Sequence, residues 1–288
     1  MTKRQHGVVV THIEHLDQLA DCLSRGEHDT VKVVTKFGID GGWNAENRSR
    51  LLRMVPHVIV RTSFGDPSFR QPDADFRFPF ANQVIGELQE WYDIRHDIMF
   101  EIGNEPNIDA PDDDFIFDYQ AHLALAIQKC RDNFQEAKLI SPALILDPDK
   151  RFERFNELCA DAFRSCHFIG LHFYEHFGFQ KAQQPATTDH LRRAIRLAQQ
   201  FYGDKQWYVT EYGINDEVRV SKEEKGRRYA GMAYYGESDP ALPDNVVGLT
   251  YYHLNVNSNM HRQYHIFPEG DMVFGDRVRA NPPRDLAA

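Results

Sequence analysis

The chain has 288 residues, a formal net charge of −10 at pH 7 and a sequence pI of about 5.8. This length is sufficient to bury a large core, and we expect one domain spanning residues 1–288. The acidic balance, without a dense cluster of Lys and Arg, argues against nucleic acid and anionic membrane surfaces as partners.

The N-terminal residues do not resemble a signal peptide, because the apolar run Val8-Val9-Val10 is short. The sequence contains no apolar stretch long enough to span a bilayer. The cysteines lack CxxC spacing, which predicts reduced, buried thiols at Cys22, Cys130, Cys159 and Cys166. We therefore expect a cytoplasmic protein, with release or export left open.

Short runs rich in strand formers alternate along the chain with segments of helical periodicity. Strands are predicted at 7–11, 30–37, 57–65, 98–103, 138–145, 168–174, 206–213 and 246–254. Helices are predicted at 13–24, 44–55, 82–95, 112–134, 150–164, 188–201 and 222–235. This alternation predicts a parallel sheet, and eight units favour closure into a (β/α)8 barrel. An eighth helix is not evident, and residues 264–274 predict a C-terminal hairpin in its place.

Two of the predicted strands deliver a glutamate at their C-terminal ends. The fourth ends in Asn104-Glu105-Pro106, where the proline prevents the strand from continuing. The seventh ends in Glu211, shortly before Gly213. The interval, 211 − 105 = 106 residues, leaves room for three βα units. Both carboxyl groups are therefore expected at the same end of the barrel.

Residues 101–107, with the sequence EIGNEPN, resemble the acid/base motif that ends the fourth strand in clan A of the glycoside hydrolases. This resemblance implies that Asn104 contacts the sugar 2-hydroxyl and that Glu105 protonates the leaving oxygen. It also implies that Glu211 is the nucleophile. Retaining glycosidases hold two such carboxyl groups about 5–5.5 Å apart.

The sixth predicted strand ends in His172-Phe173-Tyr174-Glu175-His176. By resemblance to the clan, His172 and Tyr174 are expected to hydrogen-bond the nucleophile. The same run fits the H-x-x-E-H pattern of zinc proteases, but that motif needs a helix to bring its histidines together. The flanking sequence favours a strand, and we expect neither metal nor cofactor.

The resemblance also implies a cation beside the nucleophile, usually supplied from the second strand of the clan, where it would keep Glu211 ionised. Arg61, on the third predicted strand, and Lys36, on the second, are the candidates; solvated strand-end charges are the alternative. The clan commonly places a tryptophan on its eighth strand, where this chain has Tyr251-Tyr252-His253. Candidates for stacking on sugar rings, each more often a core residue, are Trp43, Phe64, Tyr212, Tyr252 and His253.

Together these features predict a retaining glycoside hydrolase that cleaves β-glycosidic bonds, with a carbohydrate as its partner. One alternative is a carbohydrate-binding barrel without catalysis, although a binder has no need of both carboxylates. The other is a metal-dependent hydrolase barrel, which needs a His-x-His on the first strand that Val9-Val10-Thr11-His12 does not supply. The sugar, internal or terminal cleavage, transglycosylation and the oligomeric state stay open.

Overall fold

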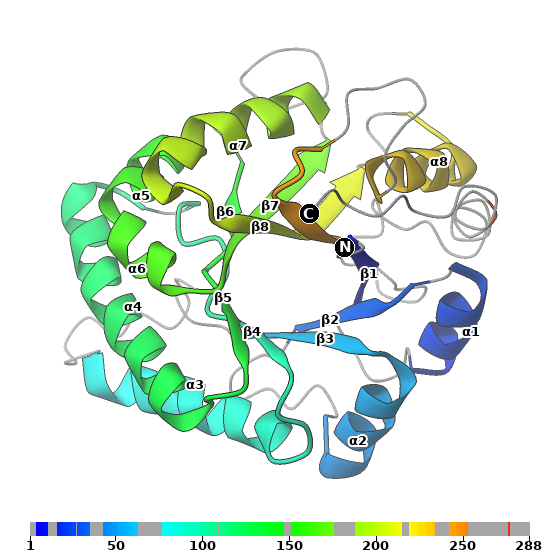
Figure 1. Ribbon diagram of the computed structural model, residues 1–288, viewed down its shortest axis with the longest axis horizontal. Helices are drawn as coiled ribbons and strands as arrows, with labels where there is room; N and C mark the ends of the chain where they lie inside the picture. Colours follow the sequence, from blue (N-terminus) through cyan, green and yellow to red (C-terminus); the bar gives the residue numbers. More distant parts are fainter. Residues whose placement is uncertain are drawn as a thin grey trace.

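A computed structural model describes residues 4–10, 16–26, 28–34, 43–62, 77–108, 110–146, 151–175, 188–214, 219–233, 242–252 and 276. Their strands form a closed ring of parallel strands, with helices on its outer side (Figure 1). The predicted (β/α)8 barrel is therefore confirmed. The predicted hairpin at 264–274, and any eighth helix, lie outside the described residues.

The strands are β1 (Gln5–Val10), β2 (Thr30–Val34), β3 (His57–Arg61), β4 (Met99–Glu101), β5 (Lys138–Ile140), β6 (Leu144–Ile145), β7 (Phe168–Glu175), β8 (Gln206–Ile214) and β9 (Val246–Tyr251). Their order is β5-β4-β3-β2-β1-β9-β8-β7-β6, and β5 also pairs with β7. One continuous strand predicted at 138–145 is instead two segments, β5 and β6. Pro142 lies between them and has no N–H to donate, which is why the ladder is interrupted there. The two segments share one of the eight barrel positions.

The helices are α1 (Leu16–Gly26), α2 (Ala45–Met54), α3 (Arg77–Tyr92), α4 (Asp113–Asn133), α5 (Phe152–Leu158), α6 (Ala160–Ser165), α7 (Thr188–Tyr202) and α8 (Lys222–Ala233). The helix predicted at 150–164 is divided at Cys159, whose backbone departs from helical values (φ −94°, ψ 7°). Asp112 caps α4 by accepting the N–H of Phe115 at 2.9 Å.

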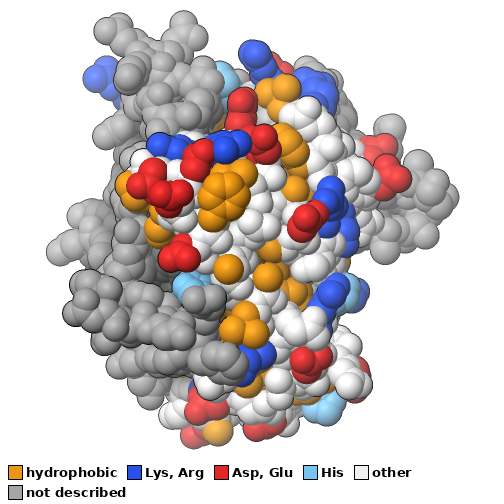
Figure 2. All heavy atoms as spheres, turned by 90° about the vertical axis from the view of Figure 1, so that its left-hand side faces the viewer, with side chains coloured by type: hydrophobic (Ala, Val, Ile, Leu, Met, Phe, Trp, Pro, Cys, Tyr) orange, Lys and Arg blue, Asp and Glu red, His pale blue; other side chains and the backbone are white. Residues whose placement is uncertain are grey.

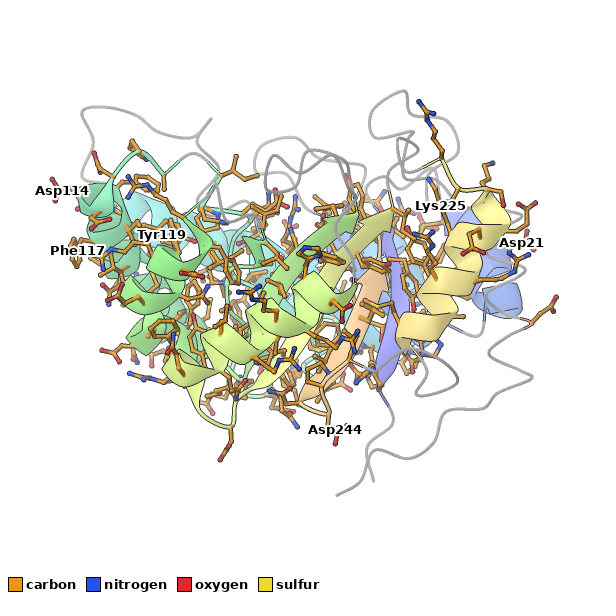
Figure 3. All side chains as sticks on the ribbon, turned by 90° about the horizontal axis from the view of Figure 1, so that it is seen from above. Asp21, Asp114, Phe117, Tyr119, Lys225 and Asp244 are labelled. Atoms are coloured by element: carbon orange, nitrogen blue, oxygen red, sulfur yellow. The ribbon has the colours of Figure 1, made fainter. Side chains whose placement is uncertain are left out.

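Helix α4 shows how the outer layer packs on the barrel. Tyr119 is buried, whereas Phe117, two residues earlier, is exposed and points away from the barrel (Figure 3). On the side of the molecule that carries α4, the described hydrophobic side chains are scattered among charges of both signs (Figure 2). Among the described helices, none is long and apolar enough to cross a bilayer.

Alternate residues of each strand face the helices and the barrel interior. Val58 and Val60 join the large cluster between strands and helices, whereas Ile59 packs with Met99, Ile140 and Tyr208 in a separate cluster. Both faces of the sheet are thus buried, which explains why the strands read as nearly continuous apolar runs. Polar side chains inside such strands are therefore unusual and informative.

The barrel closes between β1 and β9, where Gln5 is in register with Gly248. Arg4 is buried beside this junction, and its guanidinium donates to carbonyl oxygens that run from the C-terminal end of α8 to the first residue of β9. The acceptors are the oxygens of Val246 at 2.7 Å, Met232 at 3.2 Å, Leu242 at 3.4 Å and Pro243 at 3.1 Å. One side chain thus joins the first strand to the last.

The prediction of reduced, buried thiols is confirmed for three cysteines. Cys130, Cys159 and Cys166 are free and buried in the helical layer. Burial raises the pKa of the Cys159 thiol to about 12 and that of Cys166 likewise to about 12. The side chain of Cys22 lies outside the described residues.

Candidate active site

Glu105 and Glu211 meet at the carboxyl ends of the strands. Glu105 follows β4 and Glu211 lies in β8, where it is in register with His172 of β7. One oxygen of each carboxylate and one ring nitrogen of His172 all lie within 4.8 Å of one another. The side chain of Glu211 is 3% exposed and that of Glu105 is 15% exposed. A deeply buried carboxylate therefore faces a more accessible one.

Two cations contact the same oxygen of Glu211. Lys32 Nζ and Arg61 Nη1 each lie 2.9 Å from Glu211 Oε1, and the hydroxyl of Tyr174 donates to Oε2. Burial by itself raises the pKa of Glu211, but Lys32, Arg61 and the hydrogen bond from Tyr174 outweigh it and hold the pKa well below its usual range. Glu211 is thus kept ionised.

Lys32 is a site residue that the sequence interpretation missed. It lies in the middle of β2 and is completely buried, with its Nζ 2.8 Å from Oε2 of the equally buried Glu101. Burial raises the pKa of Glu101, but nearby positive charge, chiefly that of Lys32, outweighs it, and the pKa of Glu101 lies below its usual value. The available signal was a charged residue between apolar neighbours, Lys32 between Val31 and Val33 and Glu101 between Phe100 and Ile102. Lys36, the predicted cation of this strand, lies outside the described residues.

His172 lies closer to Glu105 than to Glu211. Its Nδ1 is 2.7 Å from Glu105 Oε1, whereas its Nε2 is 3.5 Å from Glu211 Oε1 and 3.0 Å from Lys32 Nζ. The prediction placed both His172 and Tyr174 on the nucleophile, and in the structure the direct hydrogen bond comes from Tyr174. Burial lowers the pKa of His172, but Glu211 and the other carboxylates raise it, and the net shift is upward.

The backbone at Glu105 has an uncommon conformation, with φ at 42°. Such left-handed geometry in a residue other than glycine costs on the order of 1–3 kcal/mol and needs support from its surroundings. The N–H of Glu105 donates to Ala143 O at 2.9 Å, and Asn107 exchanges two hydrogen bonds with the backbone of Ile145 at 2.9 and 3.0 Å. The segment between β5 and β6 therefore holds the Glu105 turn in place.

Asn104 stands next to the two carboxylates, and its Oδ1 accepts from Arg61 Nη1 at 2.7 Å. Arg61 thus links Asn104 to Glu211, which agrees with its proposed place beside the nucleophile.

The candidate stacking residues divide into three groups. Tyr252 lies beside the site, with its ring edge-to-face with Tyr174 at 5.7 Å. Tyr212 is 1% exposed and stacks on Phe173, and Trp43 is 4% exposed and packs on Trp91, so both belong to the core outside the barrel strands. Phe64 and His253 lie outside the described residues.

The convergence of Glu105, His172 and Glu211 also has the spacing of a metal-ligand set. However, Lys32 Nζ already lies within 3.0 Å of both His172 Nε2 and Glu211 Oε1. An ammonium group between these ligands opposes a metal cation by charge repulsion. His172 lies on a strand, as predicted, and His176 of the H-x-x-E-H pattern is outside the described residues.

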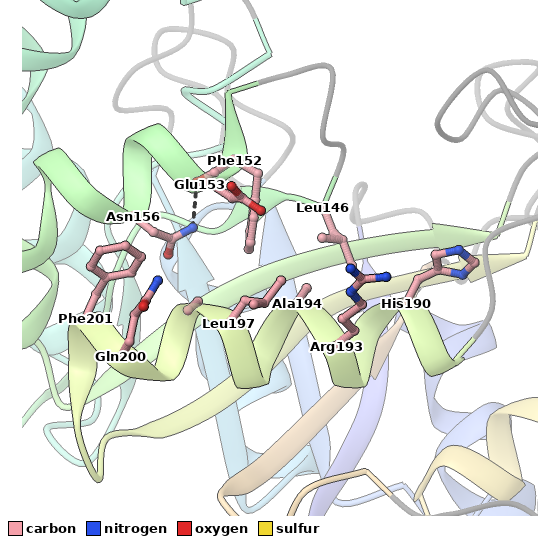
Figure 4. Close-up of a pocket in the computed structure, with 11 residues that line it drawn as sticks. Leu146, Phe152, Glu153, Asn156, His190, Arg193, Ala194, Leu197, Gln200 and Phe201 are labelled. Carbon is pink, nitrogen blue, oxygen red and sulfur yellow. Dashed lines mark hydrogen bonds between the residues drawn. The ribbon is translucent and has the colours of Figure 1, made fainter.

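A cavity of about 380 Å³ lies elsewhere, in the outer layer between α5 and α7 (Figure 4). Its wall includes Phe152, Glu153, Asn156, His190, Arg193 and Phe201. The cavity wall contains none of the predicted catalytic and sugar-binding residues that the structure describes, so the cavity is separate from the carboxylate pair.

Neither protein-family models nor curated proteins give a match to this chain. Among solved structures, a glucosidase from Croceicoccus marinus aligns with a TM-score of 0.65 at 11% identity, covering 96% of this chain and 66% of that one. A Saccharomyces cerevisiae Gas2p variant in complex with laminaritetraose and laminaripentaose aligns with a TM-score of 0.65 at 14% identity, covering 98% and 64%. A β-mannanase from Thermomonospora fusca aligns with a TM-score of 0.60 at 14% identity, covering 99% and 93%.

The chain thus spans about two thirds of the glucosidase and Gas2p chains and nearly all of the mannanase. At these identities, the similarity establishes the barrel fold.

Proposed function

We propose that this protein is a retaining glycoside hydrolase that cleaves β-glycosidic bonds. The observation that carries the proposal is the approach of Glu105 and Glu211 to within 4.8 Å at the carboxyl ends of β4 and β8. Retaining enzymes hold their two carboxyl groups about 5–5.5 Å apart, whereas inverting enzymes need about 6.5–9.5 Å to admit a water molecule. The spacing here favours direct attack by a carboxylate.

The surroundings of each carboxylate suit a different role. Glu211, ionised and held by Lys32, Arg61 and Tyr174, is the nucleophile that bonds to the anomeric carbon. Glu105, the more exposed of the two, gives a proton to the departing oxygen. In the second step Glu105 removes a proton from water, which then releases the sugar from Glu211. Lys32 and Arg61 balance the charges of Glu101 and Glu211, so the buried network is neutral when Glu105 is protonated.

The structural neighbours support a carbohydrate substrate and suggest which polymers to test. One is named a glucosidase, one a β-mannanase, and one was crystallised with laminari-oligosaccharides. We therefore propose a β-linked glucan or mannan as the substrate class.

The decisive experiment traps the covalent intermediate. The protein is incubated with 2-deoxy-2-fluoro-β-glucosyl and β-mannosyl fluorides, whose fluorine destabilises the oxocarbenium-like transition states while the good leaving group permits attack. After proteolysis, mass spectrometry is expected to find the sugar on the peptide that contains Glu211. Glu211→Gln is the matched control and should take no label.

Attachment to Glu101 or Glu175 instead would overturn the nucleophile assignment. Inversion of the anomeric configuration, observed by NMR during hydrolysis, would overturn the retaining mechanism. Binding of β-glucan or mannan without hydrolysis or labelling would support the non-catalytic barrel.

A further inference from the structure

Lys32 and Glu101 form a completely buried ion pair beside the two catalytic carboxylates. In the proposed reaction neither side chain forms or breaks a bond with the sugar. Replacing a buried ion pair with apolar residues is often neutral or stabilising, because desolvation of the charges is costly. Stability alone therefore does not account for this pair.

The contacts of Lys32 determine which atom donates in the hydrogen bond between Lys32 Nζ and His172 Nε2. An ammonium group has three N–H donors and no acceptor. Three acceptors surround Nζ: the Glu101 carboxylate, with oxygens at 2.8 and 3.0 Å, Glu211 Oε1 at 2.9 Å and His172 Nε2 at 3.0 Å. Because Lys32 can only donate, an N–H on Nε2 would set two donors face to face at 3.0 Å. His172 Nε2 therefore accepts and carries no proton, and this contact outweighs the carboxylates that raise the pKa of His172.

A neutral imidazole ring with a bare Nε2 carries its proton on Nδ1. His172 Nδ1 lies 2.7 Å from Glu105 Oε1, so this N–H donates to that oxygen. Glu105 Oε1 can accept this bond in both protonation states, because a carboxylic acid keeps one carbonyl oxygen. The exchangeable proton of Glu105 is thereby left to Oε2.

We propose that Lys32, held by Glu101, is a positioning residue that fixes the tautomer of His172 and thereby assigns the mobile proton of Glu105 to Oε2. When the glycosidic bond breaks, this proton moves from Oε2 to the departing oxygen as Glu211 bonds to the anomeric carbon. In the second step, water returns a proton to Oε2. His172 keeps its Nδ1 proton throughout. The inference rests on the proposed role of Glu105 as acid and base.

The other groups around His172 explain why the tautomer needs Lys32. Besides Lys32, Nε2 faces Glu101 Oε1 at 3.4 Å and Glu211 Oε1 at 3.5 Å, both of which accept protons. Without Lys32, the ring proton is expected to move to Nε2. Nδ1 then becomes an acceptor, and the proton of Glu105 is held on Oε1, where it faces His172 and not the substrate.

The tautomer can be measured without any substrate. In protein labelled with ¹⁵N-histidine, His172 is expected to show a protonated, pyrrole-type Nδ1 and a bare, pyridine-type Nε2. The signal is assigned by its loss in His172→Asn. The double variant Lys32→Met/Glu101→Gln removes both charges of the pair, so neither charge is left buried without its partner. In this variant the ring proton of His172 is expected to move from Nδ1 to Nε2. A wild-type ring protonated on Nε2, or no change in the variant, would overturn the proposal even if the proposed function stood.

A pair of histidine variants tests the consequence for catalysis. Asn places an amide N–H near the position of Nδ1, whereas Gln places it near Nε2. We expect His172→Asn to hydrolyse unactivated β-glycosides at least about tenfold faster than His172→Gln, and the two variants to differ little on aryl glycosides, which need little protonation. Equal rates of the two variants on both substrates would contradict an effect exerted through Nδ1 and Glu105.

Discussion

Arg61 connects two functional groups through a single nitrogen, since Nη1 donates to both Asn104 and Glu211. Its positive charge favours the ionised form of Glu211 and lowers the pKa of that carboxyl. In Arg61→Met the pKa of Glu211 is expected to rise, so a larger fraction of Glu211 is protonated at low pH. The acid limb of the pH profile of kcat/KM should therefore shift to higher pH by about one unit or more. The reason is that a nearby opposite charge shifts a carboxyl pKa by about 1–3 units.

Arg61→Lys, which keeps the charge, is the matched control and should shift the limb less. The pH profile of kcat/KM on an aryl glycoside measures both variants. An unchanged acid limb in Arg61→Met would show that a group other than Glu211 governs that limb.

Glu105 is expected to matter most when the leaving group is poor. Glu105→Gln keeps the hydrogen-bonding shape of the side chain but cannot give up a proton. Hydrolysis of an unactivated disaccharide should fall by about 10²–10⁴-fold, the usual contribution of general acid catalysis. Formation of the glycosyl-enzyme from an aryl glycoside should fall much less, which burst kinetics will measure. An equal loss on both substrates would argue against Glu105 as the acid.

At the residue scale, the strand-end glutamates were accessible to sequence analysis because strand ends are where a parallel barrel presents its chemistry. Lys32, the cation on β2 that contacts Glu211, was not accessible in the same way. Lys32 and Lys36 are four residues apart in the strand predicted at 30–37, so the sequence pattern predicts the same face for both. To choose between the two lysines, one must know the register of β2 against β3. In the structure Lys32 is opposite Ile59 and Val34 is opposite Arg61. The sequence of a single strand does not determine this register.

At the element scale, Gly248 makes room inside the barrel. A Cβ at this position of β9 would lie 2.0 Å from a ring carbon of Tyr208, a buried and tightly packed side chain. Gly248→Ala is therefore expected to lower the free energy of unfolding by about 1–3 kcal/mol, the usual cost of overpacking. Denaturant unfolding followed by tryptophan fluorescence measures this loss.

Gly86→Ala is the matched control for this substitution. Gly86 lies in α3, and a Cβ there meets nothing within 4 Å. Because alanine favours the helix over glycine, this variant should gain about 0.5–1 kcal/mol. Destabilisation by both variants to the same extent would contradict a specific clash with Tyr208.

The order and type of the elements follow from the sequence, because alternating strand and helix patterns leave a parallel barrel as the simplest closed arrangement. The interruptions do not follow from that pattern. The break between β5 and β6 was signalled by Pro142, yet the apolar run on both sides favoured one strand. The break at Cys159 has no glycine or proline to announce it, and it depends on how α5 and α6 pack against α4 and α7.

At the scale of the whole molecule, the barrel exists only if its first and last strands join. The pairing of β1 with β9 closes the ring, and Arg4 reinforces it by donating to the carbonyl oxygens of Pro243 and of Val246, the first residue of β9. These segments are about 240 residues apart in sequence, as in the bond between Arg4 and Val246, which spans 242 positions. The closing contact is thus among the most non-local in the chain.

Arg4→Met tests whether this junction holds the whole barrel together. The side chain is 3% exposed, so its loss leaves buried carbonyl oxygens without their charged donor. We expect the free energy of unfolding to fall by about 3 kcal/mol, or about 5 °C in Tm, and amide exchange to accelerate along both β1 and β9. Arg53→Met, at an exposed position of α2, is the control and should stay within about 0.5 kcal/mol of the wild type. If Arg4→Met accelerated exchange near Arg4 alone and left Tm unchanged, the junction would be a local contact, and closure would depend on the β1–β9 hydrogen bonds themselves.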